Sequence, residues 1–191
     1  MKLFFNLAIL FCSLNYLSMA QEGKDNHLQF WGKLEQHCGK AYAGKVLTAP
    51  VPKDFQQQGL VMHFISCGEG QIRIPFVVGE NRSRTWIFTL NNQSIQLKHD
   101  HRHEDGSPDD ITMYGGTSPN TGFAELQYFP ADQETVDLIP YAAGNVWWVT
   151  ISDSTFTYNL RRVSSDKPIR VEFDLTEEVE APDAPWGWRE E

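Results

Sequence analysis

The stretch LKHDHRHEDG places three histidines at alternate positions, His99, His101 and His103. Alternate residues of a β-strand point to the same face, so three imidazoles would stand in one row, about 6.5–7 Å apart. Two of them could share a zinc or copper ion, with the third histidine or a residue of another strand, such as His63, as a further ligand. A metal site is therefore one hypothesis for the function of this stretch.

The residues between the histidines predict which face of the strand the histidines occupy. In segment 93–104 the other face is wholly polar: Ser94, Gln96, Lys98, Asp100, Arg102 and Glu104. We expect this polar face to contact water, because an antiparallel strand commonly has one face on the core and one in solvent. The histidines then continue the apolar face that Ile95 and Leu97 begin, from the core toward one end of it.

The preceding segment, 82–91, changes from basic to apolar residues along one face. Arg82, Arg84 and Trp86 alternate there. If Asn92-Gln93 forms a two-residue hairpin turn, the two strands take a defined register. This register pairs Phe88 with Leu97, Trp86 with His99, Arg84 with His101 and Arg82 with His103.

This pairing favours an anion over a metal cation. The charges of Arg82 and Arg84 oppose a cation unless acids fold over it, for which Glu104, Asp105, Asp109 and Asp110 are candidates. An arginine fork and histidine donors suit an acidic group, and the apolar interior suits a hydrophobic body. We therefore expect a site for a small anionic or amphiphilic ligand, built from Arg82, Arg84, Trp86, His99, His101 and His103. A cluster satisfied by buried acids and loop carbonyls, binding nothing, is the alternative.

Each residue has an expected role in this site. Arg84 and His101 hold the acidic group, His99 and Trp86 form the floor, and Arg82 and His103 guard the rim. We expect His63 to be structural, the acidic turn 104–110 to be solvated, and Tyr114-Gly115-Gly116 to mark a bulge or a close backbone approach.

The elements that must position these residues are almost all strands. A short helix is expected over 26–38, where Leu28, Trp31 and Leu34 have helical spacing and Asn26 is the candidate N-cap. Alternation and turn residues predict about ten strands, near 42–48, 59–67, 71–78, 82–91, 93–104, 111–115, 122–129, 145–151, 154–162 and 169–175. This pattern predicts an all-β, single antiparallel barrel, lipocalin-like, with one short N-terminal helix.

The chain is expected to be exported. Residues 1–20 resemble a signal peptide that ends in Ser18-Met19-Ala20. The barrel domain is then 21–176, and an acidic tail follows over 177–191. In the tail, Trp186 and Trp188 either pack on the barrel or serve a partner. Cys38 and Cys67 are expected to form a disulfide in an oxidising compartment, the periplasm or the medium.

Composition and motifs narrow the function further. The 16 basic and 25 acidic side chains give a net charge of −9, which argues against nucleic acid and acidic lipid surfaces as partners. His101, His103 and Asp105 match part of the metallo-β-lactamase motif, but Gly106 replaces its next histidine. No GxSxG, nucleotide-loop or cupin pattern is present. We favour a function without catalysis and assign no catalytic residues. No cofactor is expected; the alternative is a bound zinc or copper ion.

Several blocks of the sequence resemble a family of small exported bacterial proteins of uncharacterised function. They are IRIPFVVGENRSRTW, LKHDHRHEDG, MYGG, VEFDLT and APWG, and they span nearly the whole mature chain. The resemblance implies export and no particular activity. The chain also resembles lipocalin-like barrels in size, signal peptide, N-terminal helix and strand number, although Gly39-Lys40-Ala41-Tyr42 replaces their Gly-x-Trp. Three functions stay open: a ligand-binding barrel, a metalloprotein, and a structural or interaction module of the cell envelope.

Overall fold

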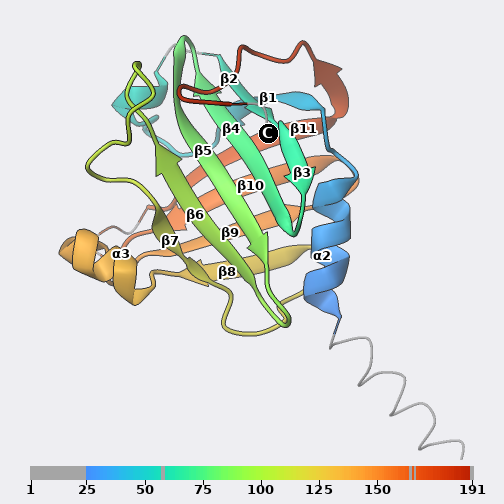
Figure 1. The fold of residues 1–191 in the computed structure, drawn as a ribbon, viewed down its shortest axis with the longest axis vertical. Coiled ribbons are helices and arrows are strands. Elements are labelled where there is room, and N and C mark those ends of the chain that lie inside the picture. The colour runs from blue at the N-terminus through green and yellow to red at the C-terminus, as the bar shows by residue number, and fades with distance from the viewer. Residues whose placement is uncertain (1–24, 57–58, 164, 166, 190–191) are drawn as a thin grey trace, which may run out of the picture.

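Ten antiparallel strands wrap into one nearly closed barrel in the computed structural model, which describes residues 25–56, 59–163, 165 and 167–189 (Figure 1). The signal peptide expected over residues 1–20 lies outside the described residues. The strands are β1 (Ala41–Val46), β2 (Leu60–His63), β3 (Ser66–Gly68), β4 (Gln71–Val78), β5 (Asn81–Leu90), β6 (Ile95–His101), β7 (Tyr114–Thr117), β8 (Leu126–Pro130), β9 (Val146–Ile151), β10 (Thr155–Arg161) and β11 (Ile169–Val179). Their order around the barrel is β7-β6-β5-β4-β2-β1-β11-β10-β9-β8, with β3 paired to β4 beside it. The predicted all-β barrel is confirmed.

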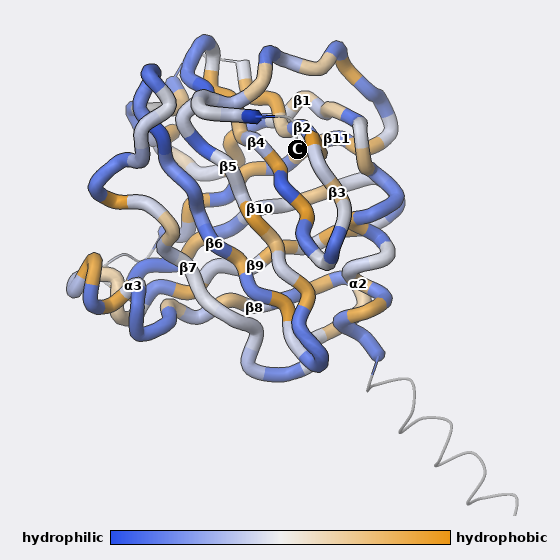
Figure 2. The backbone as a smooth tube through the Cα atoms, viewed as in Figure 1, coloured by the Kyte–Doolittle hydropathy of each residue, from blue (hydrophilic) through white to orange (hydrophobic). Residues whose placement is uncertain are grey.

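Alternation along the strands fills the barrel interior. In β4, Ile72 and Ile74 are fully buried, and in β11 Val171 and Phe173 take the same side. Hydrophobic and hydrophilic stretches accordingly follow one another along the strands in Figure 2. The interior is rich in aromatic rings, which bury large apolar areas and fix their neighbours by ring packing.

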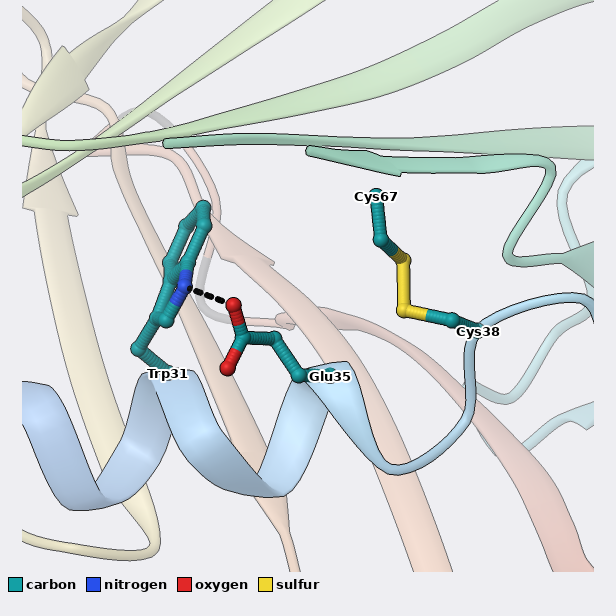
Figure 3. Close-up of a disulfide and its surroundings, with 4 residues drawn as sticks. All are labelled: Trp31, Glu35, Cys38 and Cys67. Atoms are coloured by element: carbon teal, nitrogen blue, oxygen red, sulfur yellow. Dashed lines mark hydrogen bonds between the residues drawn. A yellow bond between two sulfur atoms is a disulfide. The ribbon is translucent and has the colours of Figure 1, made fainter. Parts of the chain in front are cut away.

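The predicted N-terminal helix is α2 (Asn26–Glu35), which packs on the barrel through Phe30, Trp31 and Leu34. Asp25, and not Asn26, occupies the N-cap position. The Trp31 indole donates a hydrogen bond of 2.8 Å to Glu35 Oε1 one turn later (Figure 3). Within the described chain, no helix is long and apolar enough to cross a membrane.

The predicted disulfide between Cys38 and Cys67 is present and ties the segment after α2 to β3 (Figure 3). The two cysteines are 29 residues apart in the sequence. Closing a loop of this length contributes on the order of 3–4 kcal/mol in the chain-entropy model. The helix is therefore fastened covalently to the barrel wall.

The prediction that only strands follow the first helix is wrong. A second helix, α3 (Gln133–Leu138), lies between β8 and β9, and two short 3-10 turns cover Lys53–Phe55 and Pro140–Ala142. Asp132 caps α3, because its carboxylate accepts a hydrogen bond from Thr135 N at 2.9 Å. A helix of fewer than two turns carries too little periodicity to be read from the sequence.

The barrel closes where β7 meets β8, at the predicted close approach of Tyr114-Gly115-Gly116. A Cβ on Gly116 would collide with the carbonyl oxygen of Pro130, and one on Gly115 with the carbonyl oxygen of Leu97. The Thr135 hydroxyl accepts from Gly115 N and donates to Gly115 O, at 2.7 and 2.8 Å. This glycine seam, Gly115-Gly116, joins β7 to β8 and α3 without a ladder of strand pairing.

The C-terminal residues return to the barrel wall. Strand β11 runs to Val179, beyond the predicted end at residue 175, because Val179 and Glu178 pair with β1. Further on, Asp183 forms an ion pair of 3.2 Å with Arg82, and Trp186 N donates to Arg82 O. Trp186 and Trp188 lie half-buried against the outer face of β4 to β6, as one of the two expectations for the tail stated.

Candidate functional site

The predicted hairpin register is confirmed from the turn to Arg84 and His101, and the last predicted pair, Arg82 with His103, lies beyond the paired part of the strands. Arg84 lies opposite His101 and Trp86 opposite His99. Strand β6 ends at His101, and His103 is exposed in the following loop, where its N–H donates to Ser107 O. The Arg82 side chain binds Asp183 and the carbonyl of Ala184 in the tail.

A cavity of about 330 Å³ opens at the end of the barrel where β6 and β10 finish and β7 begins. Four of the six predicted ligand-binding residues line this cavity. They are Arg84, Trp86, His99 and His101, joined by Pro52, Phe55, Phe76, Thr85, Tyr114, Tyr158, Leu160, Arg162 and Ile169. Arg82 and His103 lie outside it.

Two arginines bring unpaired positive charge to the cavity. Arg84 is half-buried on β5, and Arg162 is exposed just after β10. Among the residues that the structure describes, neither guanidinium has a hydrogen bond or an ion pair, although both lie close enough to influence Tyr114 and Tyr158 electrostatically. Within the described residues, the five donors of each guanidinium are therefore not used by the protein.

His99 is locked in a neutral form beneath the arginines. Its Nδ1–H donates to the carbonyl of Tyr114 at 3.0 Å, which leaves Nε2 to accept from the Tyr158 hydroxyl at 2.7 Å. Complete burial lowers the pKa of His99 to about 3. Both ring nitrogens are thus committed to the protein, and the imidazole stays uncharged at neutral pH.

His101 and Tyr114 form a second neutral pair at the cavity wall. Tyr114 Oη lies 3.0 Å from His101 Nε2. Burial, and then the charge of Arg84, lowers the pKa of His101. Burial raises the pKa of Tyr114 to about 12, so the phenol keeps its proton. The wall therefore offers neutral hydrogen-bonding groups beside two fixed cations.

Stacked aromatic rings form the floor of the cavity. Trp86 stacks on Phe76 with ring centroids 4.9 Å apart and on Tyr158 at 4.5 Å. Phe55, from the 3-10 turn at 53–55, packs against Phe76 at 5.9 Å. The arrangement combines an apolar floor with a cationic wall, as an amphiphilic anion requires.

The row of three histidines does not assemble into a metal site. His99 uses both nitrogens, His103 is on an exposed loop, and His63 lies on the face of β2 opposite the buried Leu60 and Met62. In the described part of the chain, no group of three or more His, Cys, Asp or Glu residues could hold a metal ion. The acids of the 104–110 turn also stay with their own loop, where Asp105 accepts from Ser107 N and Oγ.

The prediction that the polar face of β6 contacts water is wrong at its centre, where Lys98 and Asp100 are buried. Lys98 Nζ binds Asp132 at 2.7 Å and Glu134 at 2.8 Å, at the start of α3. Asp100 accepts from Arg102 Nε and from the Thr112 hydroxyl, each at 3.0 Å. The covering segments are distant in sequence, so the strand pattern could not reveal them.

The sequence did not assign nine of the lining residues to the site, and three of these carry the tyrosine and arginine groups of the wall: Tyr114, Tyr158 and Arg162. The signal for two of them was present, because Tyr158 and Arg162 share the alternating face of Phe156 and Leu160 in the predicted strand 154–162. Tyr114 follows a loop and gave no such pattern.

Comparison with known proteins identifies no family. No family model and no curated protein matches the chain. One solved structure, a redesigned β barrel, mFAP1, bound to DFHBI, is similar over 74% of this chain and 98% of its own, with 11% sequence identity and a TM-score of 0.33.

Proposed function

We propose that the protein binds a small anionic amphiphile, without catalysis, in the cavity at the end of its barrel. One observation carries the proposal: Arg84 and Arg162 have no acidic partner among the described residues, although they border an apolar cavity. Arg84 is half-buried, and a partly buried charge without a partner costs free energy, which a bound anion would recover through charge-assisted hydrogen bonds.

The neutral groups around the arginines support the same conclusion. His101 and Tyr114 add hydrogen-bonding atoms but no charge, since the pKa of the imidazole is lowered and that of the phenol is raised to about 12. Trp86 and Phe76 offer ring faces to a hydrophobic body. In this arrangement Arg84 and His101 hold the acidic group, as the sequence suggested, and Arg162 takes the place that Arg82 was expected to fill.

A pair of fluorescent probes that differ by one sulfonate tests the proposal. The probes are 1-anilinonaphthalene-8-sulfonate, which is anionic, and N-phenyl-1-naphthylamine, which is neutral. We expect Arg84→Gln to weaken binding of the sulfonate about tenfold or more, the loss of one hydrogen bond to a charged group. Binding of the neutral amine should stay within about twofold.

Arg82→Gln is the matched control, because Arg82 lies two residues away on β5 but binds the tail. It should leave the dissociation constants of both probes unchanged. Equal affinity of wild-type protein and Arg84→Gln for the sulfonate would contradict the proposal.

We further propose that the protein acts outside the cytoplasm. The disulfide between Cys38 and Cys67 supports this location, because such bonds persist in oxidising compartments. Mass spectrometry of protein from the periplasm and the medium tests it, through the position of the mature N-terminus and the oxidation state of both cysteines. Protein found only in the cytoplasm with two free thiols would refute export.

A further inference from the structure

A second cavity adjoins the first. It measures about 290 Å³ and lies under the loop 102–113 and the 3-10 turn at 140–142, whereas the first lies against the turn at 53–55. We call them the outer lobe and the inner lobe. The two lobes share His101, Tyr114, Tyr158, Leu160 and Arg162, which therefore form a ridge between them.

The ridge is mainly polar, and each lobe adds apolar residues of its own. Four of the five ridge residues carry a hydrogen-bonding or cationic group. Apart from Leu160 on the ridge, the apolar residues line one lobe only, among them Phe76 and Trp86 in the inner lobe and Ile111 and Tyr141 in the outer lobe. An acidic group at the ridge would thus have an apolar compartment on either side.

Charge places the acidic group on the inner side of the ridge. Arg84 lines the inner lobe only, Arg162 lines both, and Asp109 lines the outer lobe only. Hydrogen bonding to Ile111 N lowers the pKa of Asp109, so its carboxylate is ionised and repels a second anion. The acidic group of a ligand is therefore favoured on the inner side of the ridge, where both arginines lie and Asp109 does not.

The outer lobe also exposes apolar surface. Ile111 is 42% exposed and Tyr141 is 83% exposed at its rim. A hydrophobic group in the outer lobe would cover these side chains and gain the free energy of burial. Such a group cannot belong to the part of the ligand that already fills the inner lobe.

We infer that the ligand is an anion with two apolar arms, its acidic group at the ridge and one arm in each lobe. This inference rests on the proposed function and specifies its ligand class. A single-chain amphiphile, with its acidic group at one end, fills one lobe only.

Two isomeric carboxylates test the inference by calorimetry, 2-butyloctanoate, with two arms, and dodecanoate, with one. They have the same charge and the same number of carbon atoms. We expect the branched isomer to bind at least about tenfold more tightly, the equivalent of about two additional buried methylene groups. Tyr141→Ser should reduce this preference about threefold or more by weakening the branched isomer only.

Tyr128→Ser is the matched control, because Tyr128 is also exposed but lies on β8 outside both lobes. It should leave both affinities unchanged. If both isomers bind equally and Tyr141→Ser changes neither, the two-armed ligand is refuted while the anion site stands. If neither isomer binds, and the anionic fluorescent probe is insensitive to Arg84→Gln, the proposed function itself fails.

Discussion

On the outer face of the β5–β6 hairpin, Lys98 pairs with Asp132 and Glu134, and Asp100 with Arg102. On the inner face, Arg84 contacts no acid among the described residues and His99 is held neutral. Proteins usually pair the charges that they bury, and the outer face follows this rule. The inner face departs from it beside a cavity, where an unpaired charge can recognise a ligand.

The largest expected effect concerns His99 on the inner face. Its pKa is about 3 in the folded protein and near 6.5 in the unfolded chain. The unfolded state binds the proton first, so this contribution to stability is complete above pH 6.5 and is lost as the pH falls toward 3. As the pH falls through this window, we expect the contribution of His99 to the free energy of unfolding to decrease by roughly 1.4 kcal/mol per pH unit.

Urea unfolding at a series of pH values measures this slope, with His99→Gln for comparison. His37 and His63, whose pKa values burial also lowers, titrate in both proteins, so their contributions cancel in the difference between the two slopes. His101 interacts electrostatically with His99, so this interaction is part of the measured difference. An identical slope in the variant would show that His99 is not protonated on unfolding in this range.

The next effect is expected on the outer face. Lys98→Met keeps the aliphatic stem but removes the ammonium from Asp132 and Glu134. We expect a loss of about 2 kcal/mol in the free energy of unfolding, below the full cost of breaking a buried pair because Glu134 is exposed. Lys45→Met is the control, since its pair with Glu172 is at the surface, and should cost less than about 0.5 kcal/mol in urea unfolding. Equal losses in both variants would remove the distinction between buried and exposed pairs.

The smallest effect should have the opposite sign. Arg84→Leu removes a charge that has no partner in the described part of the chain, so we expect no loss of stability and a gain of up to about 1 kcal/mol in thermal or urea unfolding. The same variant should raise the pKa of His101, which NMR titration measures, because the charge of Arg84 helps to lower it. Marked destabilisation by Arg84→Leu would mean that the arginine is structural and that the two faces do not differ.

The sequence predicted which residues pair within a hairpin, but not which distant segments pack on that hairpin. The hairpin register could be read because a two-residue turn fixes which residues face each other, as Asn91 N and Ser94 O now do across it. The register does not place His103, because β6 ends at His101. The expected exposure of Lys98 was wrong, because the acids that bind it, at the start of α3, lie more than thirty residues away in the sequence.

The sequence predicted one wall of the candidate site, and the opposite wall was missed. Arg84 and His101 came from one hairpin, whose register is local. Tyr158 lies on β10 and Arg162 directly after it, across the barrel. Alternation gives the face of a strand but not its distance from another strand. Only the closed barrel brings these two walls together.

The glycine seam at Gly115-Gly116 has a mechanical consequence. The edge strands of the sheet, β7 and β8, are held together by side-chain hydrogen bonds and close backbone contact, not by strand pairing. Since Tyr114 begins β7 and also forms part of the ridge, this seam runs beside the two lobes. Separating β7 from β8 there would break no ladder of strand pairing.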